Sequence, residues 1–103
     1  MKLTHTKSFK ADSAWGSELI ALFGDISVRA HWTDQPYRWH KNTGREVFMV
    51  VDGTVDMHYR ENGKEEMMTL QAGDALTIED GEEHVAHPRG EARILVIENI
   101  YSE

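Results

Sequence analysis

The fold of this chain is organised around the segment YRWHKNTGREVFMVVDG, residues 37–53. It begins with a polar turn that has His40 at one end and Glu46 at the other, and it continues into an apolar run that closes on an Asp-Gly pair. A histidine and a carboxylate, held by a tight turn between two β-like segments, could form half of a metal site. The strongest candidate for the other half is His84, in the stretch GDALTIEDGEEHVAHP.

The clearest local signal downstream is a β-hairpin centred on Asn62-Gly63. An Asn-Gly pair between two strand-like runs is typical of a two-residue type I′ turn. Such a turn predicts that Val55 faces Leu70. On the same side of the hairpin it places Met57 opposite Met68. The other side is mostly polar, as expected for an antiparallel pair with one face on the core.

Short β-rich runs separated by turn residues fill the rest of the chain. They comprise residues 18–23, 26–32, 37–40, 46–51, 75–79, 83–87 and 92–100. No segment has a long apolar 3.6-residue period, so we expect little helix. The pattern predicts an all-β fold, a single antiparallel β-barrel or jelly roll over residues 17–103. Residues 1–16 read as an N-terminal arm or edge strand anchored by Trp15.

Length and composition limit the classes of function. A chain of 103 residues holds one domain with one modest core. Its 18 acidic and 11 basic residues give a formal net charge of -7, which repels nucleic acid and anionic lipid. There is no cysteine, no apolar leader and no apolar run of bilayer length. We therefore expect a cytoplasmic protein that binds neither nucleic acid nor membrane.

Two of the expected strands are apolar on both faces, residues 46–51 and 93–97. A strand of this kind needs cover on both sides, from a second layer of the same chain or from a partner. Because the chain is small, we expect it to form a homodimer.

Two groups of residues resemble the sequence motifs of a known family. The first is His40, Glu46 and Gly53, and the second is Gly73, Gly81 and His84. In type and spacing they resemble the two motifs of the cupin superfamily, over roughly residues 24–100, and most of all its small single-domain members. The resemblance implies a small barrel that binds a small molecule. It also implies a divalent metal (Fe, Mn, Zn or Ni) on His40, Glu46 and His84, with no organic cofactor.

The chain departs from the family pattern at two positions. The second histidine of the first motif is replaced by Asn42, or by Lys41 if the turn is aligned one residue differently, and the motif proline is replaced by Glu79. The implied ligand set therefore falls from four protein ligands to three. Two histidines and one carboxylate still suit non-haem Fe(II) or catalytic zinc. Asn42 could add a carbonyl oxygen as a fourth ligand, whereas Lys41 would repel a cation.

The interior of the barrel should be apolar, with the polar groups at its mouth. We expect four side chains to line the pocket, with the first of them nearest the site: Phe48, Val50, Met57 and Tyr59. Without a metal, His40 and His84 would be neutral polar residues of a water-filled mouth, hydrogen-bonded to Glu46. That simpler interpretation is as well supported by the sequence as the metal site.

The remaining histidines have no partner that their spacing predicts. We assign no role to His5 or His31, and we expect His58 and His87 to lie at the surface or rim. Trp39 should point away from the site if its strand is regular.

Three functions remain open from the sequence. The first is a divalent-metal-dependent enzyme on a small organic molecule, of the oxidoreductase or isomerase class, with no catalytic residue assigned beyond the metal ligands. The second is a non-catalytic small-molecule binding or sensing domain. The third is a structural homodimer with a vestigial, metal-free pocket. The three candidate ligands favour the enzyme, and the missing second histidine favours the other two.

Overall fold

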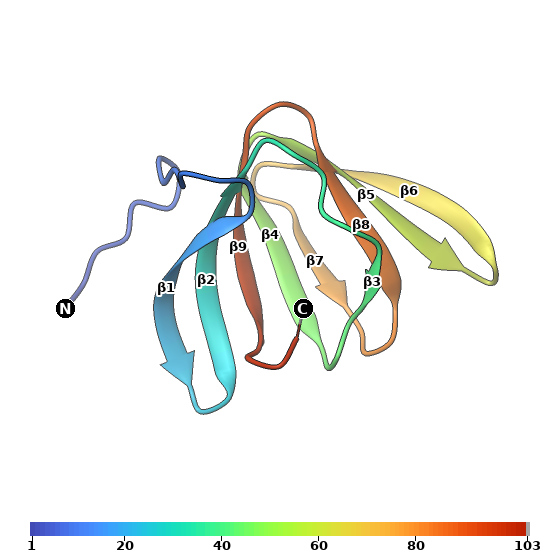
Figure 1. Ribbon diagram of the computed structural model, residues 1–103, viewed down its shortest axis with the longest axis horizontal. Helices are drawn as coiled ribbons and strands as arrows, with labels where there is room; N and C mark the ends of the chain where they lie inside the picture. Colours follow the sequence, from blue (N-terminus) through green and yellow to red (C-terminus); the bar gives the residue numbers. More distant parts are fainter. Residues whose placement is uncertain (103) are drawn as a thin grey trace.

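The computed structural model describes residues 1–102, which form two antiparallel sheets with no helix (Figure 1). The strands are β1 (Gly16–Phe23), β2 (Ile26–Thr33), β3 (His40–Lys41), β4 (Glu46–Asp52), β5 (Thr54–Glu61), β6 (Lys64–Gln71), β7 (Ala75–Ile78), β8 (Glu83–Pro88) and β9 (Ala92–Asn99). One sheet has the order β1-β2-β9-β4-β7 and the other the order β3-β8-β5-β6. The predicted all-β, jelly-roll-like architecture is confirmed.

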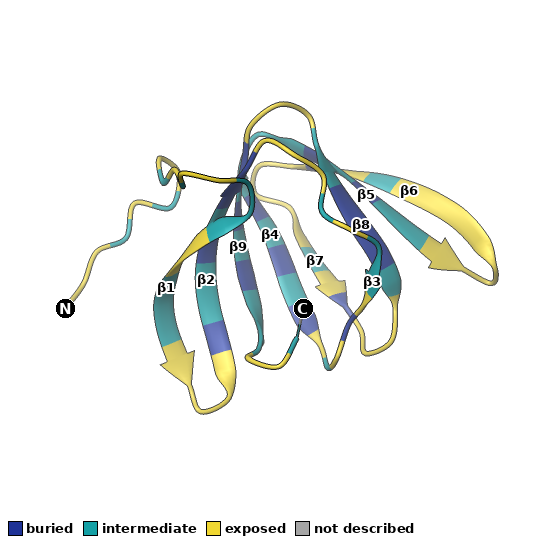
Figure 2. Cartoon of the chain, viewed as in Figure 1, coloured by how far each residue is buried: buried dark blue, intermediate teal, exposed yellow. Residues whose placement is uncertain are grey.

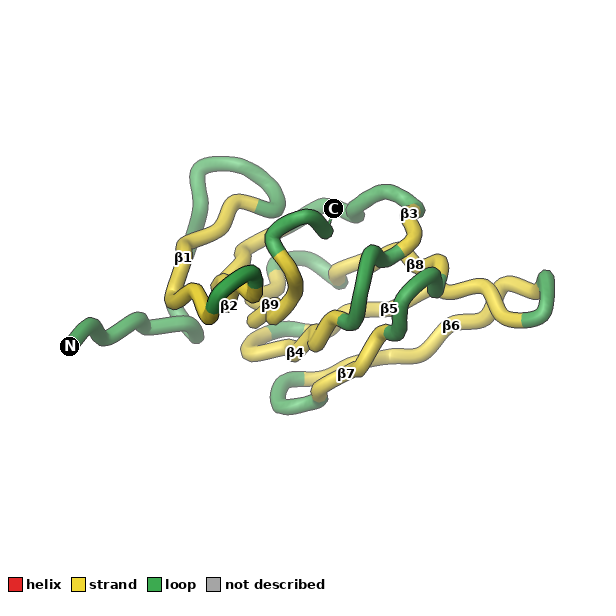
Figure 3. Tube along the Cα trace, turned by 90° about the horizontal axis from the view of Figure 1, so that it is seen from below, coloured by secondary structure: helices red, strands yellow, loops and turns green. Residues whose placement is uncertain are grey.

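The core lies between the two sheets. Successive side chains of a strand point to opposite faces, so every second residue is directed into this core. On β4, Glu46, Phe48 and Val50 are buried while the intervening residues are not, and the same alternation runs along β9 (Figure 2). Figure 3 shows the strands and their connecting loops from below. The core then continues onto β5 and β8, where Met57 and Ala86 are buried. At one end of this apolar interior the inward positions become polar, and that end carries the candidate site.

The predicted hairpin is confirmed in its turn and in its register. Asn62 has a φ of 52° and Gly63 a φ of 75°, as a type I′ turn requires at both central residues. Val55 pairs with Leu70, and Met57 pairs with Met68. The turn end of this hairpin extends from the body of the protein, on the side of β8 away from β1 and β2 (Figure 1).

The outer face of the five-stranded sheet carries the other apolar side of β4 and β9. One cross-strand row runs through Val28, Ile97 and Val47. The next row holds Ala30, Leu95 and Met49. Within residues 1–102, no helix is long and apolar enough to cross a bilayer.

Candidate metal centre

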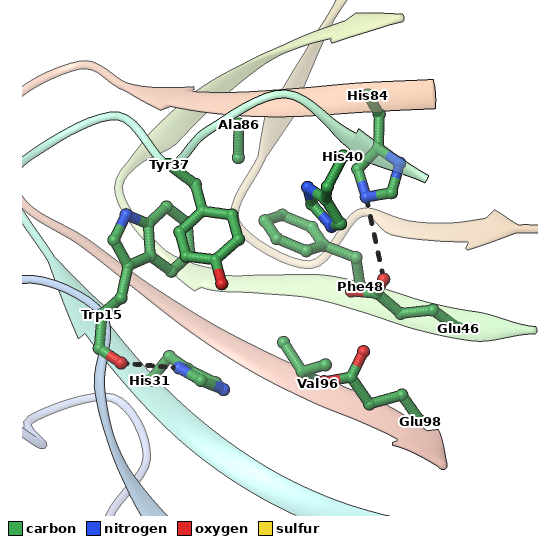
Figure 4. A pocket seen from close by; sticks show the side chains of 10 residues that line it. All are labelled: Trp15, His31, Tyr37, His40, Glu46, Phe48, His84, Ala86, Val96 and Glu98. Carbon is green, nitrogen blue, oxygen red and sulfur yellow. Dashed lines mark hydrogen bonds and ion pairs between the residues drawn. The ribbon is translucent and has the colours of Figure 1, made fainter. Parts of the chain in front are cut away.

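Three strand ends bring His40, Glu46 and His84 together. His40 on β3 is paired directly with His84 on β8, and Glu46 begins β4 in the facing sheet. One ligand atom from each residue lies within 4.8 Å of the other two. Figure 4 shows the two imidazoles and the carboxylate directed toward a common point at one end of a pocket.

The loops that carry these residues are tied to each other by hydrogen bonds. The Gly44 amide donates to the Asp80 carboxylate at 2.7 Å, and the Gly81 amide donates to the Asn42 carbonyl at 2.9 Å. Gly44 has a φ of 81° and Gly81 a φ of 80°, a conformation that glycine adopts without strain. The geometry of both turns therefore depends on glycine, and it holds His40 and Glu46 in place relative to β8.

Both histidines are fixed in one tautomer by the backbone. His40 Nδ1 lies 3.0 Å from the Arg38 carbonyl oxygen, and His84 Nδ1 lies 3.1 Å from the Glu82 carbonyl oxygen. A carbonyl oxygen only accepts, so each Nδ1 must donate a proton. A neutral ring then has its lone pair on Nε2, which is the arrangement that histidine ligands of metals show. Burial lowers the pKa of His84 and favours this neutral form.

Glu46 is buried without a counter-charge at bonding distance. Only 6% of its surface is exposed, and burial, helped by the charge of Glu98, raises its pKa to about 7. Its Oε1 has no hydrogen-bond partner in the described chain. The contact from His84 Nε2 to this oxygen is 3.8 Å, which is too long for a hydrogen bond. Burial disfavours charge on both groups, so we treat the contact as two lone-pair donors facing each other rather than as an ion pair.

The donor atoms of the site fit a divalent cation. Two neutral Nε2 lone pairs and an unpartnered carboxylate oxygen converge on one point, and the Nδ1 atoms of both histidines are already held by backbone carbonyls. A cation at that point would stabilise the charged carboxylate and so lower the pKa of Glu46, against the effect of burial. The donor set suits Fe(II), Mn(II) or Zn(II).

Asn42, the residue at the second-histidine position of the motif, lies behind Glu46. It is 3% exposed, and its amide lies close enough to lower the pKa of Glu46 partly. Among residues 1–102, however, neither of its amide atoms has a well-aligned partner. Asn42 does not border the pocket, so the structure places it beside a candidate ligand rather than on the open side of the site.

The pocket in front of the three ligands has a volume of about 110 Å³. Its lining consists of Trp15, His31, Tyr37, His40, Glu46, Phe48, His84, Ala86, Val96 and Glu98 (Figure 4). The ring of Tyr37 packs edge-on against Trp15 at 5.3 Å and against His40 at 5.2 Å between centroids. An aromatic wall therefore runs from the surface to the candidate ligands.

Trp15 has an unusual backbone conformation for a residue of its size. Its φ is 62°, a region in which a bulky residue costs roughly 1–3 kcal/mol. Its carbonyl oxygen accepts a hydrogen bond from His31 Nδ1 at 3.2 Å, and its ring packs against the core. The expectation that Trp15 anchors the N-terminal segment agrees with this packing, but the ring also forms one wall of the pocket.

The residues expected to line the pocket are distributed over three places. Phe48 borders the pocket. Val50 lies in the core, with 0% of its surface exposed. Met57 and Tyr59 border a second hollow, on the far side of His84 toward β6 and β7. The two hollows are separated because β8, which carries His84, lies between β3 and β5 in the sheet.

Several residues that line the pocket were not predicted from the sequence to do so. Trp15 and Tyr37 lie outside the strands, so no periodicity marks them. Only the strand register identifies His31 as a residue of the inner face, because it pairs with the buried Ile94. The other histidines lie elsewhere: the rings of His58 and His87 are 4.5 Å apart and neither borders the pocket. Trp39 stacks under Arg60 at 3.9 Å, away from the candidate ligands.

The chain is similar to known proteins in its sequence and in its fold. The family model described as "Cupin domain" matches residues 26–98. A comparison with curated proteins finds no significant match. Among solved structures, a cupin-2 domain protein from Shewanella frigidimarina NCIMB 400 is 29% identical, with a TM-score of 0.76 over 86% of this chain and 84% of the other.

Two enzymes share the fold at lower identity. Hydroquinone 1,2-dioxygenase from Sphingomonas sp. TTNP3, solved with 4-hydroxybenzoate bound, is 22% identical, with a TM-score of 0.76 over 86% of this chain and 28% of the other. Fe(II)-HppE, solved with an alternative substrate, is 14% identical, with a TM-score of 0.63 over 74% of this chain and 43% of the other. At these identities the likeness extends to the fold alone.

Proposed function

Since this chain belongs to the cupin family, we propose that it is a divalent-metal-dependent enzyme that acts on a small organic molecule. His40, Glu46 and His84 hold the metal, and the substrate occupies the adjoining pocket. One observation carries the proposal: two histidines with inward-facing Nε2 atoms and a buried, unpartnered carboxylate oxygen converge at one end of a largely apolar pocket. Cupins host many unrelated activities, so the family by itself does not supply the reaction.

The protein residues would prepare the site before substrate binds. The Arg38 and Glu82 carbonyls hold the two imidazoles in the tautomer that presents Nε2. Glu46 must release its proton to serve as an anionic ligand, so protons compete with the metal near the Glu46 pKa of about 7. When bound, a divalent ion supplies Lewis-acid chemistry, and iron also supplies redox chemistry.

The pocket walls indicate a small, flat substrate. Trp15, Tyr37 and Phe48 present aromatic surface, and Ala86 and Val96 leave room between them. A volume of about 110 Å³ is of the order that holds one six-membered ring, since a buried apolar cavity of roughly 150 Å³ binds benzene. His31 adds a polar group at the other end. Its Nδ1 donates to Trp15, so Nε2 remains to accept from a hydroxyl or N–H of the substrate.

A second candidate function is a non-catalytic binding domain that uses the same pocket. Asn42 in place of the motif histidine favours it, because one protein ligand fewer weakens a metal site. The aromatic walls would serve a binding domain equally well. The two candidates differ in whether the bound molecule is converted to product.

We also propose a homodimer. On the outer face of the five-stranded sheet, the row Val28–Ile97–Val47 and the pair Leu95–Met49 are partly exposed and form an apolar surface that one copy can present to another, whereas Ala30 of the second row is already buried within the chain. A two-fold axis pairs the same face of both copies. A specific dimer of this kind buries about 800 Å² on each partner.

The test is a turnover screen with matched variants. Chelator-stripped protein is loaded separately with Fe(II), Mn(II) and Zn(II), and incubated in air with single-ring phenols, hydroxybenzoates and their saturated analogues. Products are detected by mass spectrometry. Turnover by wild type and His87→Gln that is absent in His84→Gln supports the enzyme. Tight binding of a ring compound without product, with every metal, rejects the enzyme in favour of the binding domain.

A further inference from the structure

Glu98 on β9 lies beside Glu46 across the strand pair. Val47 pairs with Ile97, and Phe48 pairs with Val96. One further step of this antiparallel register places Glu46 opposite Glu98, and directly opposed residues have Cβ atoms about 4.5–5.5 Å apart. Both side chains belong to the inner face, because both border the pocket. Figure 4 shows the Glu98 carboxylate directed into the pocket, toward the side where Glu46 and the imidazoles converge.

The two carboxylates share a partly buried environment with little positive charge. Glu46 is buried and Glu98 is half-buried. The Arg29 guanidinium donates at 3.2 Å to the Ser17 hydroxyl, on the edge strand. Two adjacent carboxylates repel unless a proton or a cation lies between them. His40 and His84 come from the other sheet and border the same pocket.

We propose that Glu98 is the fourth protein ligand of the metal centre, which then holds its divalent ion with two histidines and two carboxylates. This inference rests on the metal centre of the proposed function. The second carboxylate brings the protein charge at the site to -2, which balances a divalent cation. Glu98 occupies the role that Asn42 leaves empty, since Glu98 borders the pocket and Asn42 does not.

The donor set also predicts which metal is preferred. Carboxylate oxygens suit Mn(II) and Fe(II), whereas the soft donors that favour copper(I) are absent from the pocket lining. Loss of Glu98 should therefore weaken Mn(II) binding more than it weakens Zn(II) binding, because zinc is satisfied by four ligands and can replace a carboxylate with water.

The experiment is Mn(II) titration of chelator-stripped protein at about pH 8, where the carboxylates are ionised. Glu98→Gln preserves the shape and removes the anionic ligand, and Glu98→Asp preserves the charge but withdraws it by one methylene. Glu66→Gln on β6 is the control: Glu66 is exposed, the substitution removes the same charge, and β5 lies between Glu66 and His84. Far-UV circular dichroism and melting confirm that each variant is folded. We expect both Glu98 variants to bind Mn(II) at least about tenfold more weakly and Glu66→Gln to change by less than about twofold.

A second readout separates ligation from long-range attraction. Water proton relaxation reports how many water molecules are bound to Mn(II), and removing a protein ligand should add one. An extra water in both Glu98 variants supports the proposal. Wild-type affinity and hydration in Glu98→Asp and Glu98→Gln would overturn it while leaving the three-ligand centre intact. A wild-type protein that binds no Mn(II), Fe(II) or Zn(II) would overturn the proposed function and this inference together.

Discussion

Replacing Glu46 with glutamine should stabilise the metal-free protein at alkaline pH and leave its stability unchanged at acid pH. The pKa of Glu46 rises from an ordinary 4.5 to about 7. Because one pH unit corresponds to about 1.4 kcal/mol, keeping Glu46 ionised in the folded state costs roughly 3 kcal/mol. Glu46→Gln removes that cost, and its amide can pair with the neighbouring Asn42 amide, whose atoms are unpartnered among residues 1–102.

The direction of the pH dependence follows from the folded state holding its proton more tightly. The stability contributed by protonated Glu46 is fully present below pH 4.5 and is lost as the pH rises through about 7. His84 acts in the opposite direction: burial lowers its pKa, so its contribution is present above its ordinary value of 6.5 and is lost as the pH falls. Both proteins contain His84, so the difference in unfolding free energy between wild type and Glu46→Gln is largely free of the His84 contribution.

The assay is urea or thermal unfolding in the presence of a chelator at about pH 5 and about pH 8.5. Both proteins are compared at one concentration, because a dimer would make the transition concentration-dependent. At the higher pH, Glu46→Gln should melt above wild type by roughly 4–8 °C for each kcal/mol. At the lower pH the two should nearly coincide. Saturating Mn(II) should reverse the order, because the ion stabilises only the protein that binds it.

The reasoning would be refuted by a variant no more stable than wild type at about pH 8.5, since Glu46 would then not be a buried, unfavourable charge. An equal gain at both pH values would mean that the substitution acts through packing and not through ionisation.

Three further predictions concern the site, the turns and the sheet face. Metal affinity should weaken as the pH falls below about 7, because Glu46 must be ionised and His84 neutral to bind; calorimetric affinities that do not change between about pH 8 and 6 would contradict this. Gly53→Ala should destabilise the protein more than Gly63→Ala, because both have positive φ but only a Cβ at Gly53 would lie 2.5 Å from a backbone oxygen; equal melting temperatures would contradict this. Ile97→Glu should convert a dimer to monomer in light scattering at micromolar concentration, and a wild type that is already a monomer of 11.8 kDa would exclude the dimer.

Local chemistry made much of the fold predictable. The Asn62-Gly63 turn determined the pairing of its hairpin, since a type I′ turn leaves only one register for the flanking strands. The alternation along β4 likewise indicated that Glu46 and Phe48 share the inner face. These features depend on neighbouring residues, and they are the ones that sequence patterns describe.

The pocket depends on how the two sheets pack, which the local pattern does not contain. Trp15 and Tyr37 reach it from segments without regular structure. Tyr59 was expected there because it alternates inward on its strand, but β5 lies beyond β8 and carries it to a different hollow. The β4–β9 register places Glu98 opposite Glu46. The sequence does not determine that register, because the two strands are far apart in the chain.

The most direct test of the account is a calorimetric titration of Mn(II) into chelator-stripped protein at about pH 8. The titration gives the number of ions bound to each chain, and the site variants show where they bind. We predict one ion per chain for wild type and for His87→Gln, with binding lost in His84→Gln and Glu46→Gln. Failure of wild type to bind, or binding that survives in His84→Gln and Glu46→Gln but is lost in His87→Gln, would contradict the assignment of the metal centre.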